Sequence, residues 1–128
     1  LLTQEGTVTL DDVEGYHTVT ASRIVSNRVI GDVVFIGTGA GINAEIWPYE
    51  DGTIFIDSTG GTVDLFLPYG GDYDVEIWGD IEHGVTVTDL GFDQFYLAED
   101  YFAGERGTGA ITVEVYAVGG AVNLYESI

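Results

Sequence analysis

Acidic side chains are the most abundant chemically active groups of the chain, and several stand close enough in the sequence to share a cation. Hard cations such as Ca²⁺ take roughly six to eight oxygen ligands, often carboxylates supplied by loops. No EF-hand spacing is present, so a specific site must be assembled from neighbouring carboxylates. The candidate Ca²⁺ ligands are Asp11, Asp12 and Glu14 in one group and Asp72 and Asp74 in another.

Paired carboxylates also catalyse glycoside hydrolysis, in which one acid protonates the leaving group and the other acts as base or nucleophile. Glu45, Glu76 and Glu114 lie within segments that alternate polar and apolar residues, and this alternation points them outward rather than into a cleft. His17 and His83 lie in different β segments without the spacing of metal ligands. We therefore expect a protein that is not an enzyme and that requires no cofactor.

Three glycines imitate a nucleotide-binding motif. Gly37, Gly39 and Gly41 follow an apolar run, and Asp57 stands twenty residues after Gly37, as in a dinucleotide-binding fingerprint. That fingerprint needs a helix directly after the glycines, because the helix N-terminus binds the pyrophosphate. Residues 42–49 are instead typical of a strand. We expect a flexible inter-strand loop at the glycines and no nucleotide site.

The charge balance is extreme. Asp and Glu number 22 against three Arg, Lys is absent, and the formal net charge is −19. Such a chain repels itself at low ionic strength, whereas in about 1 M salt the Debye length of about 3 Å screens most of that repulsion. The composition favours a halophilic protein; a Ca²⁺-collecting surface and ordinary acidic solubility are the alternatives. Nucleic-acid binding is disfavoured because phosphate contacts need a cationic face.

The elements that must position these groups are strands. Runs of β-branched and aromatic residues end in Gly, Asp or Asn about every 8 to 12 residues, and no window has the helical period. The expected strands span residues 7–10, 16–25, 32–36, 42–49, 53–57, 62–67, 73–78, 85–88, 92–97, 110–118 and 121–125. Residues 98–109 are the longest expected loop, and Gly119-Gly120 is the expected turn of a closing hairpin.

These features predict one domain over residues 1–128. A chain of 128 residues with 45% hydrophobic residues is long enough for one core, and the absence of Cys excludes disulfides. No run of about 18 apolar residues exists, so no membrane span is expected. The predicted fold is all-β: a single-domain antiparallel β-sandwich or jelly-roll-like barrel of about ten strands.

Two Trp, eight Tyr and six Phe complete the inventory. Tyr and Trp are enriched at protein interfaces, and their rings also stack on sugars, so an interface and a glycan-binding face are both open. Trp47 and Trp78 are the residues on which a glycan-binding face would depend. The predicted interface patch, beside a Gly-rich loop, consists of Phe92, Phe95, Tyr96, Tyr101 and Phe102.

The order of short motifs over residues 51–125 resembles that of a known class. DGTIFID at 51–57 leads into GGTVDLFLP at 60–68, and the chain closes with AITVEVYAVGGAVNLY at 110–125. This resembles the small β domains of tailed-virus structural proteins, namely head fibres, capsid decorations and tail-fibre modules. The chain departs from their pattern at Val122-Asn123, where a Trp is common. The resemblance implies an oligomeric, often trimeric, virion protein without catalysis.

The resemblance and the acid excess together point to a virus of a halophilic archaeon. We expect a structural protein displayed on the virion surface as a capsid decoration, turret or fibre. Its expected partners are further copies of itself, with a trimer favoured, and a capsid or tail protein. The alternatives are a subunit of an extracellular or cell-surface filament and a carbohydrate-binding module.

Overall fold

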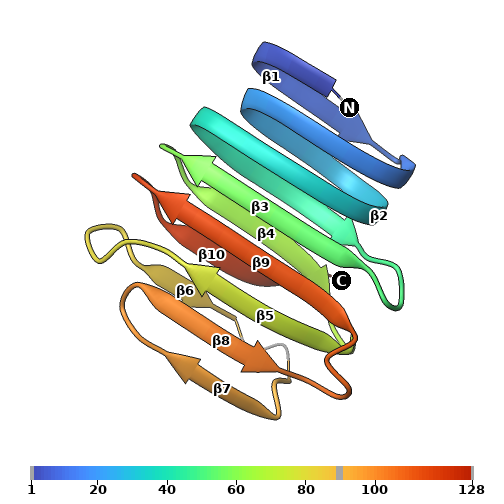
Figure 1. The fold of residues 1–128 in the computed structure, drawn as a ribbon, viewed down its shortest axis with the longest axis vertical. Coiled ribbons are helices and arrows are strands. Elements are labelled where there is room, and N and C mark those ends of the chain that lie inside the picture. Colours follow the sequence, from blue (N-terminus) through green and yellow to red (C-terminus); the bar gives the residue numbers. More distant parts are fainter. Residues whose placement is uncertain (1, 89–90, 128) are drawn as a thin grey trace.

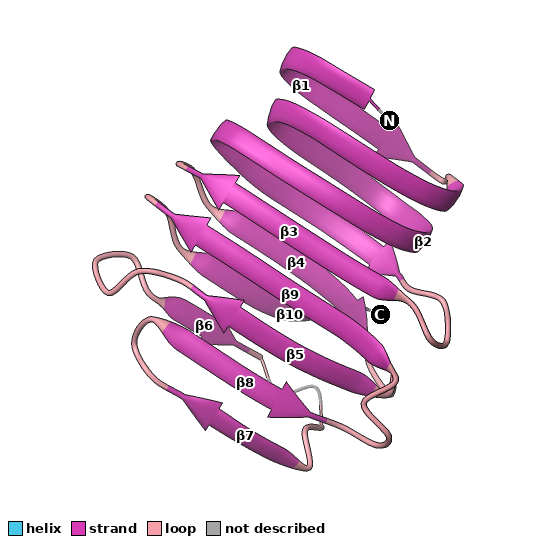
Figure 2. Ribbon diagram, viewed as in Figure 1, coloured by secondary structure: helices cyan, strands magenta, loops and turns pink. Residues whose placement is uncertain are grey.

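The structure of the chain is a computed structural model that describes residues 2–88 and 91–127. Figure 2 shows strands joined by turns and loops, with no helix in these two ranges. The predicted all-β class is therefore confirmed. The strands are β1 (Leu2–Asp11), β2 (Glu14–Trp47), β3 (Thr53–Thr59), β4 (Val63–Pro68), β5 (Tyr73–Trp78), β6 (Val85–Val87), β7 (Gln94–Leu97), β8 (Tyr101–Glu105), β9 (Ile111–Val118) and β10 (Val122–Ser127).

The strands form one mixed sheet that curls around itself, so the chain winds as a coil (Figure 1). The order along the sheet is β6-β10-β4-β2-β3-β9-β5-β8-β7, and β1 pairs with β2. We call β3, β9, β5, β8 and β7 the front layer and β4, β10 and β6 the back layer. β2 is long because it belongs to both layers: residues 33–37 pair with β3 and residues 42–45 pair with β4.

The turns of the coil do not stack in chain order. β3-β4 and β5-β6 are successive turns of the chain, and β9-β10 is the last. Nevertheless β9 lies between β3 and β5, and β10 lies between β4 and β6. The final turn, which we call the inserted turn (β9 and β10, residues 111–127), is thus placed between two turns that precede it in the chain (Figure 1).

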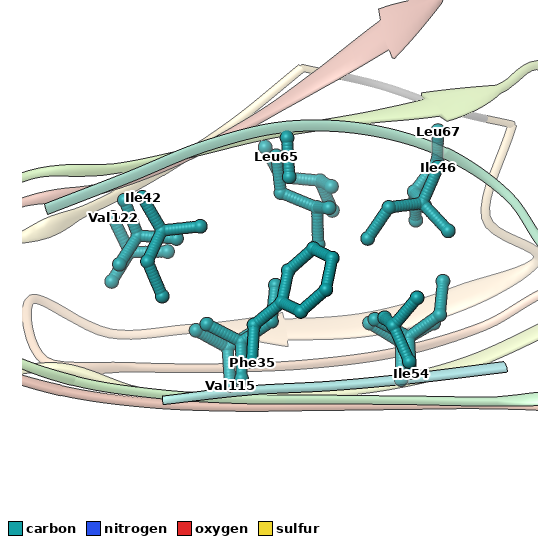
Figure 3. Packing of buried hydrophobic residues seen from close by; sticks show 14 of the residues in the cluster. Phe35, Ile42, Ile46, Ile54, Leu65, Leu67, Val115 and Val122 are labelled. Carbon is teal, nitrogen blue, oxygen red and sulfur yellow. The ribbon is translucent and has the colours of Figure 1, made fainter. Parts of the chain in front are cut away.

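The two layers share one hydrophobic core. In β5 and β9 every second residue is buried, as period-two patterning predicts. Phe35 and Ile54 point from one side toward Leu65 and Val122 on the other (Figure 3). Burial of each such side chain stabilises the fold by about 1.5–3 kcal/mol. The coil is therefore flattened, with one layer of strands packed on each side of the core.

Successive turns touch at a corner made of glycine. A Cβ on Gly61 would lie 2.4 Å from the nitrogen of Gly41, and a Cβ on Gly120 would lie 1.7 Å from the carbonyl oxygen of Gly61. Only residues without a side chain let backbones stack this closely. We call Gly41, Gly61 and Gly120 the glycine corner. The loop predicted at residues 37–41 is wrong, because these residues belong to β2.

The antiparallel sandwich or jelly roll is not confirmed. Seven of the nine pairs between different described strands are parallel, and two are antiparallel. The alternation of polar and apolar residues is the same in both arrangements, so it does not distinguish them. The hairpin predicted at Gly119-Gly120 is wrong, because β9 pairs with β3 and β5 while β10 pairs with β4 and β6. The loop predicted at 98–109 contains β8, which gains its backbone partners from β5 and β7.

Candidate assembly surface

The predicted interface aromatics lie at one end of the coil, on β7, β8 and the segment before β7. β7 is antiparallel to β8, and it has no second neighbour among the described strands. All four residues of β7 are exposed, and none is charged. This end of the coil, which we call the β7 end, therefore presents the free backbone edge of an uncharged strand, with Glu105 of β8 beside Gln94.

Three phenylalanines gather on the inner face of the β7 end. The ring centroids of Phe92 and Phe95 lie 5.2 and 6.2 Å from that of Phe102. Phe102 is buried, whereas Phe95 is 65% exposed. Together with Val87 and Leu97, these rings line an apolar hollow of about 120 Å³. The hydrophobic core thus continues to the end of the coil and is only partly covered there.

The two tyrosines of the predicted patch lie on the outer face of the same strands, because successive side chains of a strand point to opposite faces. The ring centroids of Tyr96 and Tyr101 are 6.1 Å apart. The Tyr101 hydroxyl donates a 2.7 Å hydrogen bond to Oε2 of Glu76. This bond to a carboxylate, together with partial desolvation, raises the pKa of Tyr101. The predicted patch therefore consists of two surfaces, one on each face of the sheet.

A column of aromatic rings runs across the outer face of the front layer. Tyr116 and Trp78 stack with centroids 4.5 Å apart and ring planes 2° from parallel. Phe55 lies 5.6 Å from Tyr116, and Tyr101 lies 5.8 Å from Trp78. Aromatic pairs of this kind stabilise a protein by about 0.5–1.5 kcal/mol each. Sequence reasoning missed the column because its members come from four separate strands, β3, β9, β5 and β8.

The two tryptophans do not build a common glycan platform. Trp78 belongs to β5 of the front layer, where its ring is stacked on Tyr116. Trp47 ends β2, beyond the residues that pair with the back layer, and its Nε1 donates a 3.1 Å hydrogen bond to Glu45. Stacking on a sugar needs a free ring face, and one face of Trp78 is already covered. A glycan-binding face that depends on both tryptophans therefore stays a prediction.

The first group of candidate Ca²⁺ ligands lies where β1 turns into β2. Asp11, Asp12 and Glu14 are exposed. Oδ1 of Asp12 stands 3.8 Å from Nε of Arg28, and both residues have a positive φ, 49° and 55°. A neighbouring guanidinium already balances part of the charge of this group, and exposed pairs of this kind contribute little to stability.

The second group lies before and within β5. Asp74 points outward and is paired in register with Glu105 of β8, while the backbone carbonyl of Asp72 accepts a hydrogen bond from the amide of Ile111. Over residues 2–88 and 91–127, no three acidic or histidine side chains converge as a metal site requires. A Ca²⁺ site at either group therefore stays a prediction.

Two of the three carboxylates considered for catalysis are neighbours. Glu76 of β5 and Glu114 of β9 are paired in register on the outer face. Tyr101 donates a hydrogen bond to Glu76, and the Tyr116 hydroxyl lies 3.5 Å from Oε2 of Glu114. Partial desolvation, followed by the charge of Glu114, raises the pKa of Tyr116. Like charges directly opposite each other destabilise a strand pair, and salt screens that repulsion.

Asp80 forms a hydrogen-bonded cluster that sequence reasoning missed. Its carboxylate accepts hydrogen bonds from the amides of Gly119, at 2.7 Å, and His83, at 2.8 Å, and Nδ1 of His83 is also 2.8 Å from Oδ1. These bonds, that of Gly119 foremost, lower the pKa of Asp80. Asp80 thereby fastens the 79–84 segment to the inserted turn. The signal available in the sequence was an Asp three residues before a His between two glycines.

No protein-family model, no curated protein and no solved structure matches the chain. The resemblance to tailed-virus domains therefore remains a proposal. Within the described part of the chain, no helix is long and apolar enough to cross a lipid bilayer.

Proposed function

We propose that this chain is a non-enzymatic structural domain that assembles through its β7 end. We further propose that it acts on a virion surface, as a capsid decoration, turret or fibre domain adapted to high salt. The observation that carries the proposal is the exposed, uncharged β7 strand above an apolar hollow. The virion setting comes from the resemblance of residues 51–125, and the high-salt setting comes from the net charge of −19.

The free energy available at the β7 end favours a symmetric assembly. Phe95, Tyr96 and Leu97 are 65, 63 and 50% exposed. Full burial of a large apolar side chain is worth about 1.5–3 kcal/mol, so covering these three adds about 3–5 kcal/mol per copy. Association itself costs about 4–15 kcal/mol. In a closed homo-oligomer, such as the favoured trimer, every copy buries its own β7 end. The free energy gained by burial therefore adds up over the copies and offsets the cost of association.

Electrostatics makes this assembly dependent on salt. Each copy carries a formal charge of −19, and like-charged copies repel each other strongly in dilute buffer. Molar salt reduces the Debye length to about 3 Å, which removes the repulsion between charges that do not touch. β7 itself is uncharged, but Glu105 lies beside Gln94, so carboxylates stand next to the contact and their repulsion must be screened. Oligomers should therefore form in molar salt and dissociate in millimolar salt.

A subunit of a cell-surface filament is the second candidate, because both ends of the coil have a free edge. Among the described strands, β1 pairs with β2 alone, just as β7 pairs with β8 alone. If the β7 end of one copy met the β1 edge of the next, the sheet would continue from copy to copy. Such head-to-tail contacts do not close and give open-ended polymers. The size of the assembly therefore distinguishes the two candidates.

Sedimentation in molar NaCl tests the proposal with one variant and one matched control. Phe95→Ser removes the main exposed ring of the β7 end. Val118→Ser is the control, because Val118 is 66% exposed but lies at the end of β9, beside the glycine corner. Each protein is first folded at low concentration; the wild type and the control should then form a discrete oligomer, and Phe95→Ser should stay monomeric. A wild type that remains monomeric at every concentration refutes the proposal, and growth without limit supports the filament instead.

A further inference from the structure

The inserted turn occupies a slot built entirely by earlier residues. Seven residues of β9 pair with β3 and six pair with β5, while six residues of β10 pair with β4 and three pair with β6. Neighbouring strands lie about 4.8 Å apart, so removal of the turn leaves a gap of about 10 Å between the flanking turns. The slot is complete before the chain reaches residue 111.

The buried side chains of the inserted turn provide most of its affinity for the slot. They stand against core residues of both flanking turns. Their burial removes apolar surface from water, which favours the docked turn. The buried aliphatic residues are Ile111, Val113, Val115, Ala117, Val122 and Leu124. The slot recognises these groups whether or not they belong to the same molecule.

A short glycine-containing hinge connects the inserted turn to the rest of the chain. Residues 106–110 leave β8 on one side of β5 and enter β9 on its other side. Gly107 and Gly109 have positive φ values of 61° and 66°. The hinge is held by a few hydrogen bonds. The Gly107 amide donates to Asp93 at 2.8 Å, and Arg106 donates from its amide to the carbonyl of Tyr73 at 2.8 Å and from Nη1 to the carbonyl of Gly71 at 3.0 Å. The Arg106 guanidinium also lies 5.5 Å from the centroid of the Tyr69 ring. Opening it therefore costs far less than unfolding a layer.

We infer that a second copy of this chain can supply the inserted turn, so that two copies exchange residues 111–127 and each fills the slot of the other. The paired residues and the buried side chains are the same in the closed and exchanged forms. In molar salt, which screens the repulsion between the two copies, the two forms therefore differ mainly in the hinge and in the entropy of association, which is the condition for domain swapping. High local concentration, as in an assembly, favours the exchanged form. The inference does not depend on the β7 end.

Charge sets how readily the exchange occurs. The inserted turn brings Glu114 directly beside Glu76 of the slot, and like charges opposite each other weaken a strand pair. Millimolar salt strengthens this repulsion, so the turn should leave its slot more often there. Molar salt screens it and should preserve whichever form, closed or exchanged, was present when the salt was added.

Engineered disulfides report which chain fills the slot, because the chain contains no Cys. Glu76→Cys with Glu114→Cys links the slot to the inserted turn through neighbouring outer-face positions. Val34→Cys with Phe55→Cys is the matched control, since these neighbours both lie outside the inserted turn. Adjacent strands hold paired Cα atoms within the roughly 4.4–6.8 Å that a disulfide needs. Each double variant is unfolded, refolded at low or high protein concentration, oxidised, and separated by denaturing, non-reducing electrophoresis.

The exchange predicts covalent dimers for the first pair alone. Their mass should be twice the 13.7 kDa of one chain, and their fraction should rise with the refolding concentration. The control pair should stay within one chain at every concentration. Monomers alone from the first pair, or equal dimer fractions from both pairs, overturn the inference.

A measurement without cysteines covers the case in which the double variants do not fold. Phe95→Ser is refolded at high concentration and then diluted in molar salt. Dimers that hold through the β7 end are absent from this variant, whereas exchanged dimers should form and persist on dilution for as long as the coil stays folded. A preparation that contains only monomers after high-concentration refolding overturns the inference, while leaving the proposed role of the β7 end to its own test.

Discussion

Replacement of Gly120 by Ala tests how closely the turns of the coil stack. The added Cβ would stand 1.7 Å from the carbonyl oxygen of Gly61 and 2.3 Å from its carbonyl carbon. Ordinary contact begins at 3.4 Å, so the two backbones must separate by roughly 1.7 Å, because neither partner is a side chain that can rotate away.

The hydrogen bonds beside the glycine corner determine the size of the effect. The amide of Val63 lies 2.9 Å from the carbonyl of Ala121, and the amide of Gly60 lies 2.6 Å from that of Val118. A separation of that size breaks both hydrogen bonds, and each broken bond lowers the free energy of unfolding by about 0.5–1.5 kcal/mol. Strain in the core around Val122 adds about 1–3 kcal/mol. The expected loss is about 2–6 kcal/mol, which lowers the melting temperature by about 10 °C or more.

Gly39→Ala is the matched control for this prediction. Gly39 and Gly120 both belong to the bend between the layers, and neither has a positive φ. The nearest atom to a Cβ on Gly39 is Oγ of Ser22, at an ordinary 3.7 Å. We expect this variant to stay within about 0.5 kcal/mol of the wild type. Scanning calorimetry in molar NaCl compares the three proteins, and equal melting temperatures for the two variants would refute the close stacking of turns.

Three further predictions concern pH and salt. The buried Tyr73 hydroxyl donates a hydrogen bond to the carbonyl of Pro68, and desolvation raises the pKa of Tyr73 from 10.0 to about 12. Its contribution to the free energy of unfolding is therefore complete below pH 10 and lost as pH rises toward 12. In chemical denaturation, Tyr73→Phe should lose about 1 kcal/mol of stability at neutral pH, and its stability should fall less than that of the wild type at alkaline pH. Asp80 has a lowered pKa because it accepts hydrogen bonds from Gly119 and His83, so its contribution to stability is present above pH 3.8 and lost as pH falls below it. Asp80→Asn should therefore melt at a lower temperature than the wild type at neutral pH, and the two melting temperatures should converge in acid. A difference in melting temperature that is the same at every pH would contradict this. The wild type should melt at a lower temperature in millimolar than in molar NaCl, and an unchanged melting temperature would contradict the halophile interpretation.

The strands of this fold were largely predictable from local sequence, but their partners were not. Residues 73–78 were predicted as a strand with the bounds of β5, because Tyr73, Val75 and Ile77 alternate with polar neighbours. Which strand lies beside β5 depends on contacts far along the chain, such as Trp78 with Tyr116. No local pattern encodes a final turn that returns between two earlier ones.

The candidate surface was also predictable in its residues but not in their arrangement. The sequence grouped Phe95 and Tyr96 because they are neighbours in an aromatic-rich segment. Because side chains alternate between the faces of a strand, assigning this segment as a strand predicts that the two rings lie on opposite faces. In the structure they lie on opposite faces. The free edge of β7 depends on which strands have no second partner, and that is a property of the whole sheet. The Asp80 cluster was missed because Gly119, its main donor, is 39 residues away.

Amide hydrogen exchange of β7 (Gln94–Leu97) in molar NaCl tests the proposed assembly surface most directly. In dilute solution the free edge should exchange rapidly, since backbone amides without a partner are exposed to water. At a concentration where the oligomer forms, we predict that the β7 amides become protected while exchange at the glycine corner stays unchanged. An oligomer in which β7 exchanges as fast as in the monomer would contradict the proposal that copies meet through this strand.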